Sequence, residues 1–347
     1  MDTIPFNMTD SPMTKEHEYW RAETVAFYAL QSLHGVGFRT LYRIASQKIS
    51  FRELIKSEDP KHFGKTLRIK LPTTVLESAE SWDKFKKELW FKGTSMARMY
   101  TQKDVKVVFY DQDAFPDSLR HINEPPMWLF VQGNLKNLHT KSVAIIGSRK
   151  SSEDGHWLTK LIVAGIANKG IVSVSGLAEG IDQRAHIESI RFNVPTVAIL
   201  GTGIDSNYPK GSEVVREQIL ARGGTIATEY LIGQSYSGHN FVQRNRLQAG
   251  LSTCVIPVEW KIKSGTAHTV NFAKDFNRFL VMPCLPYTNL ENEEIKAIST
   301  YRKGQVFSVP DQTNELIGFL QKPEIQETED SPNSDFNDGE RQISLGL

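Results

Sequence analysis

The feature that most constrains the fold is a repeated alternation of short apolar runs with amphipathic helical segments, which begins at about Lys141. The runs are residues 143–146, 172–174, 197–200, 225–227, 255–258 and 279–281. Helical patterns lie between them, near residues 155–168, 182–191, 212–221, 242–251 and 266–276. Strands that are apolar on both faces and separated by one helix each are typical of a parallel sheet with helices on both sides. We therefore predict an α/β fold for this region.

One residue fits this prediction poorly. Pro257 falls inside the fifth run, and proline has no N–H to donate to a neighbouring strand. The sequence therefore predicts that this strand lies at a sheet edge or carries a bulge.

The first third of the chain has a different pattern. Apolar residues recur there at helical spacing, for example Val25, Ala29 and Leu33. Residues 34–38 read His-Gly-Val-Gly-Phe, and glycines allow the backbone that a sharp turn between two helices requires. Residues 82–87 predict an exposed amphipathic helix, and residues 105–110 a short strand followed by an extended, proline-containing connector.

These patterns divide the chain into four parts. We predict a disordered lead over 1–16, a helical N-terminal domain over 17–100, an α/β domain over 101–322 and a disordered acidic tail over 323–347.

Composition limits the possible functions. The 347-residue chain has a formal net charge of +1, so a surface that attracts nucleic acid has to be local. Cys254 and Cys284 are far apart in sequence and predict two reduced, buried thiols rather than a metal site or a disulfide. The start lacks the pattern of a signal peptide, and no run of about 18 apolar residues occurs, so we expect a cytoplasmic protein.

Small, polar or glycine-containing turns follow most of the predicted strands. These turns are Gly147-Ser148-Arg149, Ser175-Gly176, Gly201-Thr202-Gly203, Thr228-Glu229 and, before the next helix, Ser264-Gly265-Thr266. The carboxyl ends of parallel strands share one edge of the sheet, where such folds bind ligands. Glycines let a ligand approach the backbone, and the N–H groups at helix N-termini attract anions. The turns therefore predict a phosphate-binding edge, although each glycine by itself is equally consistent with a tight turn.

Familiar catalytic motifs are missing from the sequence. It contains no GxxxxGK[ST], GxSxG or HExxH pattern. Gly201-x-Gly203 is a poor dinucleotide motif, because Ser206 stands where a third glycine is expected. We predict no catalytic residue, no cofactor and no metal.

The most informative segment is residues 240–252, in which Arg244 and Arg246 flank Asn245 near the start of a helix. A helix N-terminus already carries partial positive charge, so two further cations there favour an anionic partner. Arginine matches phosphate oxygens, and the nearby Phe241 could stack on a base. The alternatives are that an arginine pairs with Glu229 or Glu259, and that Phe241 belongs to the core.

Six segments, in this order, resemble the successive sequence blocks of the DprA/Smf family. They are VAIIGSR at 143–149, SGLAEGID at 175–182, AILGTGIDSNYP at 198–209, NFVQRNRLQAGLS at 240–252, VEWKIKSGTAHTVNFA at 258–273 and FLVMPC at 279–284. The segment LHGVGFRTLYRI at 33–44 also resembles the helical hairpin, of SAM or helix-hairpin-helix type, that these proteins carry in front. The resemblance covers about residues 105–320.

The resemblance implies an extended Rossmann-like domain that binds single-stranded DNA, forms a homodimer and loads a RecA-type recombinase during natural transformation, without a reaction of its own. The DNA-binding residues that we predict on this basis are Gly147, Ser148, Arg149, Ser175, Gly176, Gly201, Thr202, Gly203, Phe241, Arg244, Asn245, Arg246, Ser264, Gly265 and Thr266.

Two alternatives stay open at this stage. Glu229 and Glu259 stand at strand ends and could imitate the carboxylate of a nucleoside-monophosphate phosphoribohydrolase, but the PGGxGTxxE loop of those enzymes is absent. A sensor of free nucleotides is the other alternative. It is favoured by the acidic tail, which we expect to be too short and polar to form the winged helix of the family.

Overall fold

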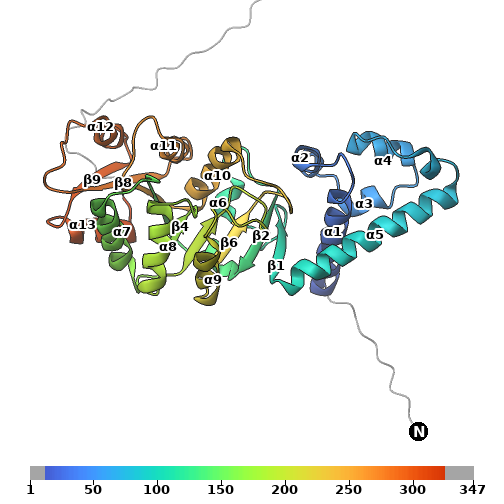
Figure 1. Cartoon of the computed structure of the whole chain (residues 1–347), viewed down its shortest axis with the longest axis horizontal. Coiled ribbons are helices and arrows are strands. Elements are labelled where there is room, and N and C mark those ends of the chain that lie inside the picture. The colour runs from blue at the N-terminus through green and yellow to red at the C-terminus, as the bar shows by residue number, and fades with distance from the viewer. Residues whose placement is uncertain (1–11, 325–347) are drawn as a thin grey trace, which may run out of the picture.

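The computed structural model describes residues 12–324, so most of the predicted lead and nearly all of the predicted acidic tail lie outside the described residues. In the described part, nine strands form one sheet in the order β1-β2-β6-β5-β4-β3-β7-β8-β9 (Figure 1). The strands are β1 Val105–Phe109, β2 Trp128–Gly133, β3 Ser142–Ile146, β4 Val172–Ser175, β5 Thr196–Ile199, β6 Thr225–Thr228, β7 Cys254–Pro257, β8 Phe279–Cys284 and β9 Gly304–Ser308.

The predicted α/β fold is confirmed. Strands β3 to β9 pair in parallel, whereas β1 and β2 add an antiparallel hairpin at one edge. From β3 the chain adds β4, β5 and β6 on one side, and then returns to add β7, β8 and β9 on the other. The strand order therefore reverses between β3 and β7, and such a switch point leaves a crevice at the carboxyl ends of the two strands.

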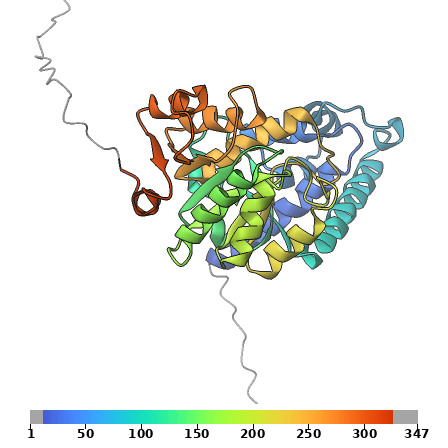
Figure 2. The same ribbon diagram turned by 60° about the vertical axis from the view of Figure 1, so that its left-hand side comes forward.

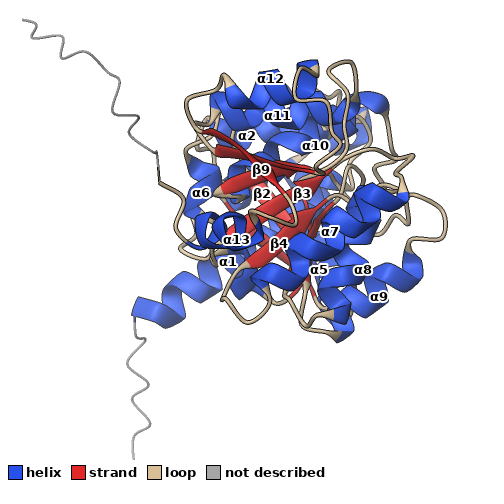
Figure 3. Ribbon diagram, turned by 90° about the vertical axis from the view of Figure 1, so that its left-hand side faces the viewer, coloured by secondary structure: helices blue, strands red, loops and turns tan. Residues whose placement is uncertain are grey.

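Helices cover both faces of the sheet. Figure 3 shows α7, α8 and α9 on one side of the strands and α10, α11 and α12 on the other. The bounds of these helices are α7 Glu153–Ile166, α8 Ile181–Arg191, α9 Glu213–Ala221, α10 Gly238–Leu251, α11 Gly265–Asp275 and α12 Glu293–Ser299. Side chains alternate along a strand, so Val143 and Ile145 pack on the α7 side and Ala144 and Ile146 on the α10 side. Two covered faces thus explain why the runs are mostly apolar at successive positions, with only small polar residues such as Ser173 and Thr225 among them.

The prediction that the strand with Pro257 is an edge strand is wrong. Strand β7 lies inside the sheet, between β3 and β8. Its pairing with β8 involves only Cys254 and Val255, and Pro257 is the last residue of the strand. The missing N–H is tolerated because the ladder to β8 has already ended.

The N-terminal domain is helical, as predicted. It contains α1 Pro12–Gln31, α2 Phe38–Ser46, α3 Phe51–Ile55, α4 Pro60–Leu67 and α5 Ala79–Gln102. Helix α1 begins inside the segment 1–16 that the sequence assigned to a disordered lead. The turn before α2 contains Gly35 at φ +86°, a left-handed conformation that favours glycine.

Helix α5 is longer and less exposed than the predicted helix at 82–87. Trp82 and Leu89 are buried, and Gly93 lies against α1, where an added Cβ would be 2.2 Å from the carbonyl oxygen of Val25. The two helices therefore pack at unusually short range.

An aromatic cluster joins the helical domain to the sheet. Phe27 of α1 contacts Phe109 of β1 and Trp128 and Phe130 of β2 at ring-centroid distances between 4.9 and 5.9 Å. These rings belong to one buried core that extends from α1 to β6. In Figures 1 and 2 the blue helices accordingly lie against the β1 edge, at the far end from β9, α12 and α13 (Thr313–Gln321). Strand β2, whose aromatic face is central to this contact, lies in the predicted connector.

Among the residues that the structure describes, none of the helices combines the length and apolarity that a bilayer crossing needs.

Candidate nucleic-acid interface

A cavity of about 820 Å³ opens at the switch point between β3 and β7. Its walls come from the segment after β3 (146–150), the segment after β7 (259–261), helix α10, and the start of α11. The sheet edge that the sequence predicted for ligand binding is therefore hollow at the position where an open α/β sheet binds its ligand.

Backbone contacts fix the two strand ends together. The N–H of Ser148 donates to the carbonyl oxygen of Glu259 at 2.6 Å. A Cβ on Gly147 would lie 2.6 Å from the side chain of Ile181, so only glycine fits this approach. The Glu259 carboxylate accepts hydrogen bonds from the N–H and hydroxyl of Ser152 at 2.9 and 3.0 Å. Glu259 thus caps the start of α7.

The next two residues, Arg149 and Lys150, are both exposed and line the cavity. The Arg149 guanidinium lies 5.7 Å from the ring centroid of Phe241. This contact places a cation and an aromatic face together at the mouth of the cavity.

Aromatic side chains continue outward from Phe241. Its ring centroid lies 5.1 Å from that of Tyr208, which is 4.3 Å from the centroid of Tyr236 in a stacked arrangement. All three line the cavity, and exposure is greatest at the outer end, where Tyr236 is 57% exposed. The series offers flat surfaces of the kind on which unpaired bases stack.

Arg244 and Arg246 point in different directions, because residues two positions apart on an α-helix are about 200° apart around its axis. Arg244 is 3% exposed and donates to the carbonyl oxygens of Gly176, at 2.6 Å, and Ile199. It therefore ties α10 to the ends of β4 and β5 while still lining the cavity.

Arg246 lies on the other side of α10, in a buried ion pair. Its two terminal nitrogens donate to the two carboxylate oxygens of Glu229 at 2.7 and 2.6 Å, and the two residues are 5% and 2% exposed. Arg246 was predicted to contact DNA, but in the structure its guanidinium is paired with Glu229 and does not line the cavity. The alternative pairing with Glu229, considered from the sequence, is the one present.

A buried carboxyl group stands beside Arg244. Burial raises the pKa of Asp182 to about 6, against the lowering effect of the nearby charges of Arg244 and Arg149. Burial and the charge of Arg244 lower the pKa of His186 to about 3, so this imidazole is neutral at physiological pH. Asp182 lines the cavity and changes its charge near pH 6.

Residues 106–304 match the family model described as DNA recombination-mediator protein A. The chain belongs to this family.

Curated relatives of this family member include protein Smf from Synechocystis sp., 37% identical over 183 residues that cover 52% of this chain and 46% of the relative. DNA processing protein DprA from Streptococcus pneumoniae is 36% identical over 166 residues, which cover 48% of this chain and 58% of that protein. The chain thus matches about half the length of these relatives.

Solved structures similar to this family member include two of DprA proteins. The DprA structure from Streptococcus pneumoniae aligns with a TM-score of 0.58 and 25% identity, over 86% of this chain and 97% of that one. The DprA structure from Helicobacter pylori, whose subject is a single-stranded DNA binding mode, aligns with a TM-score of 0.53 and 26% identity, over 61% of this chain and 96% of that one.

Most of the residues that the sequence predicted for this family member come together. Those that line the large cavity are Gly147, Ser148, Arg149, Phe241, Arg244, Asn245, Ser264, Gly265 and Thr266. Gly176 and Gly201 line a smaller cleft of about 90 Å³, which shares Arg149, Phe241 and Arg244 with the cavity.

Ser175, Thr202, Gly203 and Arg246 lie elsewhere. The Ser175 hydroxyl is buried and donates to the carbonyl oxygen of Ile145 at 2.6 Å. The Thr202 hydroxyl is buried in its own turn, and an added Cβ on Gly203 would lie 2.4 Å from the carbonyl oxygen of Leu231. Strand β5, which precedes this turn, stands two strands away from β3. The turn therefore closes against β6 rather than on the switch point.

The sequence analysis missed Lys150, Tyr208, Tyr236, Gln248 and Trp260, which also line the cavity. Lys150 directly follows the identified turn Gly147-Ser148-Arg149, and Trp260 directly follows Glu259, which was identified at a strand end, so extending each by one residue would have found them. Tyr236 precedes its helix in a loop without strand or helix periodicity, and no pattern in the sequence marks it.

Proposed function

We propose that this family member binds single-stranded DNA in the cavity between β3 and β7, without a chemical step. One observation carries the proposal: the exposed cations Arg149 and Lys150 share a cavity mouth with the aromatic series Phe241, Tyr208 and Tyr236. Cations beside stacking surfaces suit a sugar-phosphate chain whose bases are unpaired. The Helicobacter pylori relative, described as binding single-stranded DNA, supports the same reading.

The two parts of the mouth have different roles. Arg149 and Lys150 contact phosphates, so their contribution to affinity falls as the salt concentration rises. The rings take bases that are free to leave a stack, at about 1–3 kcal/mol per base. A duplex keeps its bases paired and stacked and therefore gains only the phosphate contacts.

The test compares oligo-dT with a duplex of the same length in a gel-shift titration over a range of salt concentrations. We expect tighter binding of the single strand at every salt concentration. Equal retention of both would contradict a site that uses base stacking. A protein denatured before mixing serves as the control for non-specific charge effects.

The same samples test the enzymatic alternative. Asp182 has the raised pKa of a possible general acid and lies in the cavity, so free mononucleotides are incubated under the same conditions and base release is followed by chromatography. We expect no release above the rate without protein. Release that disappears in Asp182→Asn would establish a hydrolase. Tight binding of a mononucleotide that excludes the strand would favour a sensor.

The wider role rests on the family. We propose a cytoplasmic homodimer that delivers single strands to a RecA-type recombinase, as the match to DNA recombination-mediator proteins suggests. Light scattering should give twice the monomer mass at micromolar concentration. Strand exchange by a recombinase on strands coated with single-strand-binding protein should start faster when this protein is added, and an unchanged lag would count against the role.

A further inference from the structure

The two outer rings at the cavity mouth belong to loops rather than to helices. Tyr208 lies in the loop of residues 200–212, between β5 and α9, and Tyr236 lies in the loop of residues 229–237, between β6 and α10. Both residues line the cavity, and their rings stack at a centroid distance of 4.3 Å. Loops are usually the more mobile parts of a fold, so a fixed stack at this place needs contacts that hold both loops.

The inner part of each loop is held by the core. Ile204 and Leu231 are buried and belong to the core that extends from α1 to β6. The N–H of Gly203 donates to the carbonyl oxygen of Gln234 at 2.9 Å, which joins the two loops to each other. The two tyrosines come after these anchors in their loops, so their positions depend on further contacts.

A buried arginine holds the first loop. Arg216 of α9 is 8% exposed, and burial lowers the pKa of its guanidinium, which nevertheless stays charged at physiological pH. Its Nη1 donates to the carbonyl oxygen of Ser206 at 2.5 Å and to Oδ1 of Asn207 at 2.9 Å. Its Nη2 donates to the carbonyl oxygen of Ile204 at 2.6 Å. One side chain thus fixes the backbone that leads directly into Tyr208.

An exposed carboxylate of the first loop holds the second loop. Asp205 accepts hydrogen bonds from the N–H of Gly233, at 3.0 Å to Oδ1 and 3.1 Å to Oδ2. Gly233 has a φ of +77°, a left-handed conformation that favours glycine, and it lies three residues before Tyr236. Arg216 therefore fixes the backbone on both sides of Asp205, and Asp205 fixes the turn that leads to Tyr236. We call Arg216 and Asp205 the loop clasp.

We propose that the loop clasp positions Tyr208 and Tyr236 for the bound strand before the strand arrives. This inference rests on the proposed function and assigns to it two residues that do not line the cavity themselves. A ring that is already held in its bound orientation loses less conformational freedom on binding, so it contributes more affinity than a ring on a free loop. Arg216 and Asp205 are thus positioning residues, and neither contacts the strand.

Three substitutions test the clasp. Arg216→Lys keeps the charge, but an ammonium group lacks the planar fork that reaches three acceptors. Asp205→Ala removes the acceptor, whereas Asp205→Asn keeps an acceptor oxygen with the same loss of charge, so the difference between these two variants reports the hydrogen bond alone. Asp205 is exposed, and its variants keep the test valid if the melting temperature shows that Arg216→Lys is not folded.

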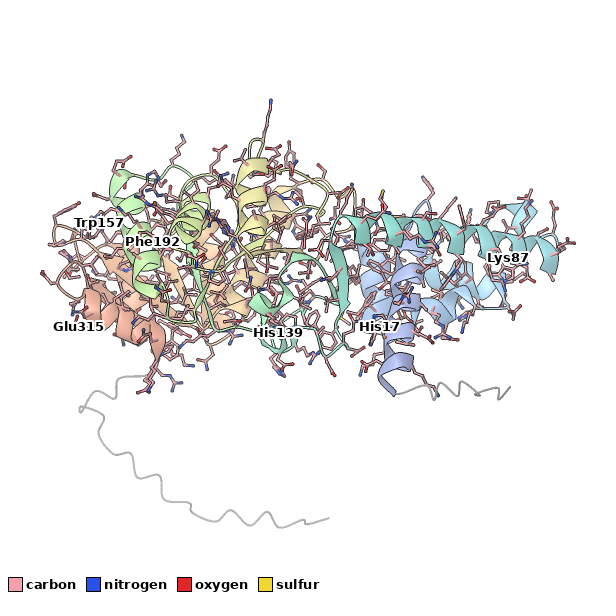
Figure 4. All side chains as sticks on the ribbon, turned by 90° about the horizontal axis from the view of Figure 1, so that it is seen from below. His17, Lys87, His139, Trp157, Phe192 and Glu315 are labelled. Carbon is pink, nitrogen blue, oxygen red and sulfur yellow. The ribbon has the colours of Figure 1, made fainter. Side chains whose placement is uncertain are left out.

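Matched controls alter similar contacts outside the cavity. Arg278→Lys changes another partly buried guanidinium, which donates to the carbonyl oxygens of Ser118 and Gly250 at 3.2 and 2.7 Å. His139→Ala removes an exposed side chain, labelled in Figure 4, whose Nε2 lies 3.0 Å from the carbonyl oxygen of Ala114. Neither Arg278 nor His139 lines the cavity, so both controls should bind like the unmodified protein.

The readout is the ratio of the affinities for oligo-dT and for an abasic strand of the same length. The ratio is used because the loss of the Asp205 charge acts on both strands alike. We expect the ratio to fall by about three- to tenfold in Arg216→Lys and in Asp205→Ala, as when one or two side chains have to be ordered on binding. Asp205→Asn should keep a ratio close to that of the unmodified protein.

A double-mutant cycle separates positioning from a general effect on the fold. In a protein that already carries Tyr208→Ala and Tyr236→Ala, Arg216→Lys should have no further effect on oligo-dT affinity, because no outer ring is left to position. A substitution that only disturbs the fold would lower the affinity by the same factor with and without the tyrosines.

The outcomes separate the two proposals. An unmodified protein that binds no oligonucleotide would overturn the proposed function itself. Binding with an unaltered ratio in both Arg216→Lys and Asp205→Ala would overturn only the loop clasp, and so would equal losses for oligo-dT and the abasic strand. A loss that persists without the two tyrosines would also overturn it, because Arg216 would then act through another group.

Discussion

Replacing Arg246 by alanine should unfold the protein more easily without weakening its binding of DNA. Arg246 was predicted from the sequence to bind DNA together with Arg244. Its guanidinium, however, pairs with Glu229 on the side of α10 away from the cavity. Arg149 provides the contrast, because it is exposed and lines the cavity mouth. The two arginines should therefore give opposite results.

The expected magnitude follows from burial. Removing Arg246 leaves the Glu229 carboxylate, itself 2% exposed, charged and without its partner. Breaking a buried pair in this way costs about 3–5 kcal/mol. With about 2.1 cal/mol/K of unfolding entropy per residue, each kcal/mol lowers the Tm of a 347-residue chain by about 1.4 °C. The melting temperature should therefore fall by about 4–7 °C.

The assay is differential scanning calorimetry combined with oligo-dT titration at a temperature where the variant is fully folded. The double variant Arg246→Met, Glu229→Leu should recover most of the lost stability, because two apolar side chains can replace a buried pair. A variant that melts normally but binds oligo-dT tenfold more weakly would refute this reasoning. It would mean that Arg246 leaves its carboxylate to meet DNA.

Three further predictions concern the cavity mouth. Arg149→Ala should weaken oligo-dT binding and reduce the slope of log affinity against log salt by about one, with an unchanged melting temperature; an unchanged slope would show that this side chain meets no phosphate. Asp182 is neutral below its pKa of about 6 and negative above it, so affinity should fall several-fold between pH 5 and pH 7. Binding by Asp182→Asn should be flat over this range, and the same fall in both proteins would assign the titration to another group. Tyr236→Ala should lose about 1–3 kcal/mol of oligo-dT affinity and Tyr236→Phe almost none. A loss of the same size for an abasic strand would exclude stacking.

The sequence predicted the parallel part of the sheet because its signal is local. Each central strand is buried on two faces, so most of its residues are apolar and the polar ones are small, as in β4 and β6, and each following helix repeats the pattern. The edge strands were harder to find. Strand β2 begins two residues after Pro126, at the end of a proline-containing connector, and three of the five residues of β9 are polar or glycine, so neither strand was found from its pattern.

Part of the site was also predicted because its signal is local. Strand-end turns can be found from the strands, and the order of the strands brings the turns after β3 and β7 together. The sequence does not give that order, so the turns after β4 and β5 were assigned to the same site as those two. The direction of Arg246 depends on a carboxylate seventeen positions away, on a loop whose path only the folded chain defines.

The aromatic contact between α1 and the β1–β2 hairpin has a consequence for anyone who divides this protein. Residues before and after position 103 form two halves that pack together through one aromatic cluster, in which Phe27 contacts Phe109, Trp128 and Phe130. A cut near residue 103 would therefore expose large aromatic side chains on each fragment. The two fragments would aggregate and be poorly soluble rather than fold as independent domains. The two halves should also melt in one transition, because the helices cover the face of the hairpin that carries these rings and neither half can keep that face buried alone.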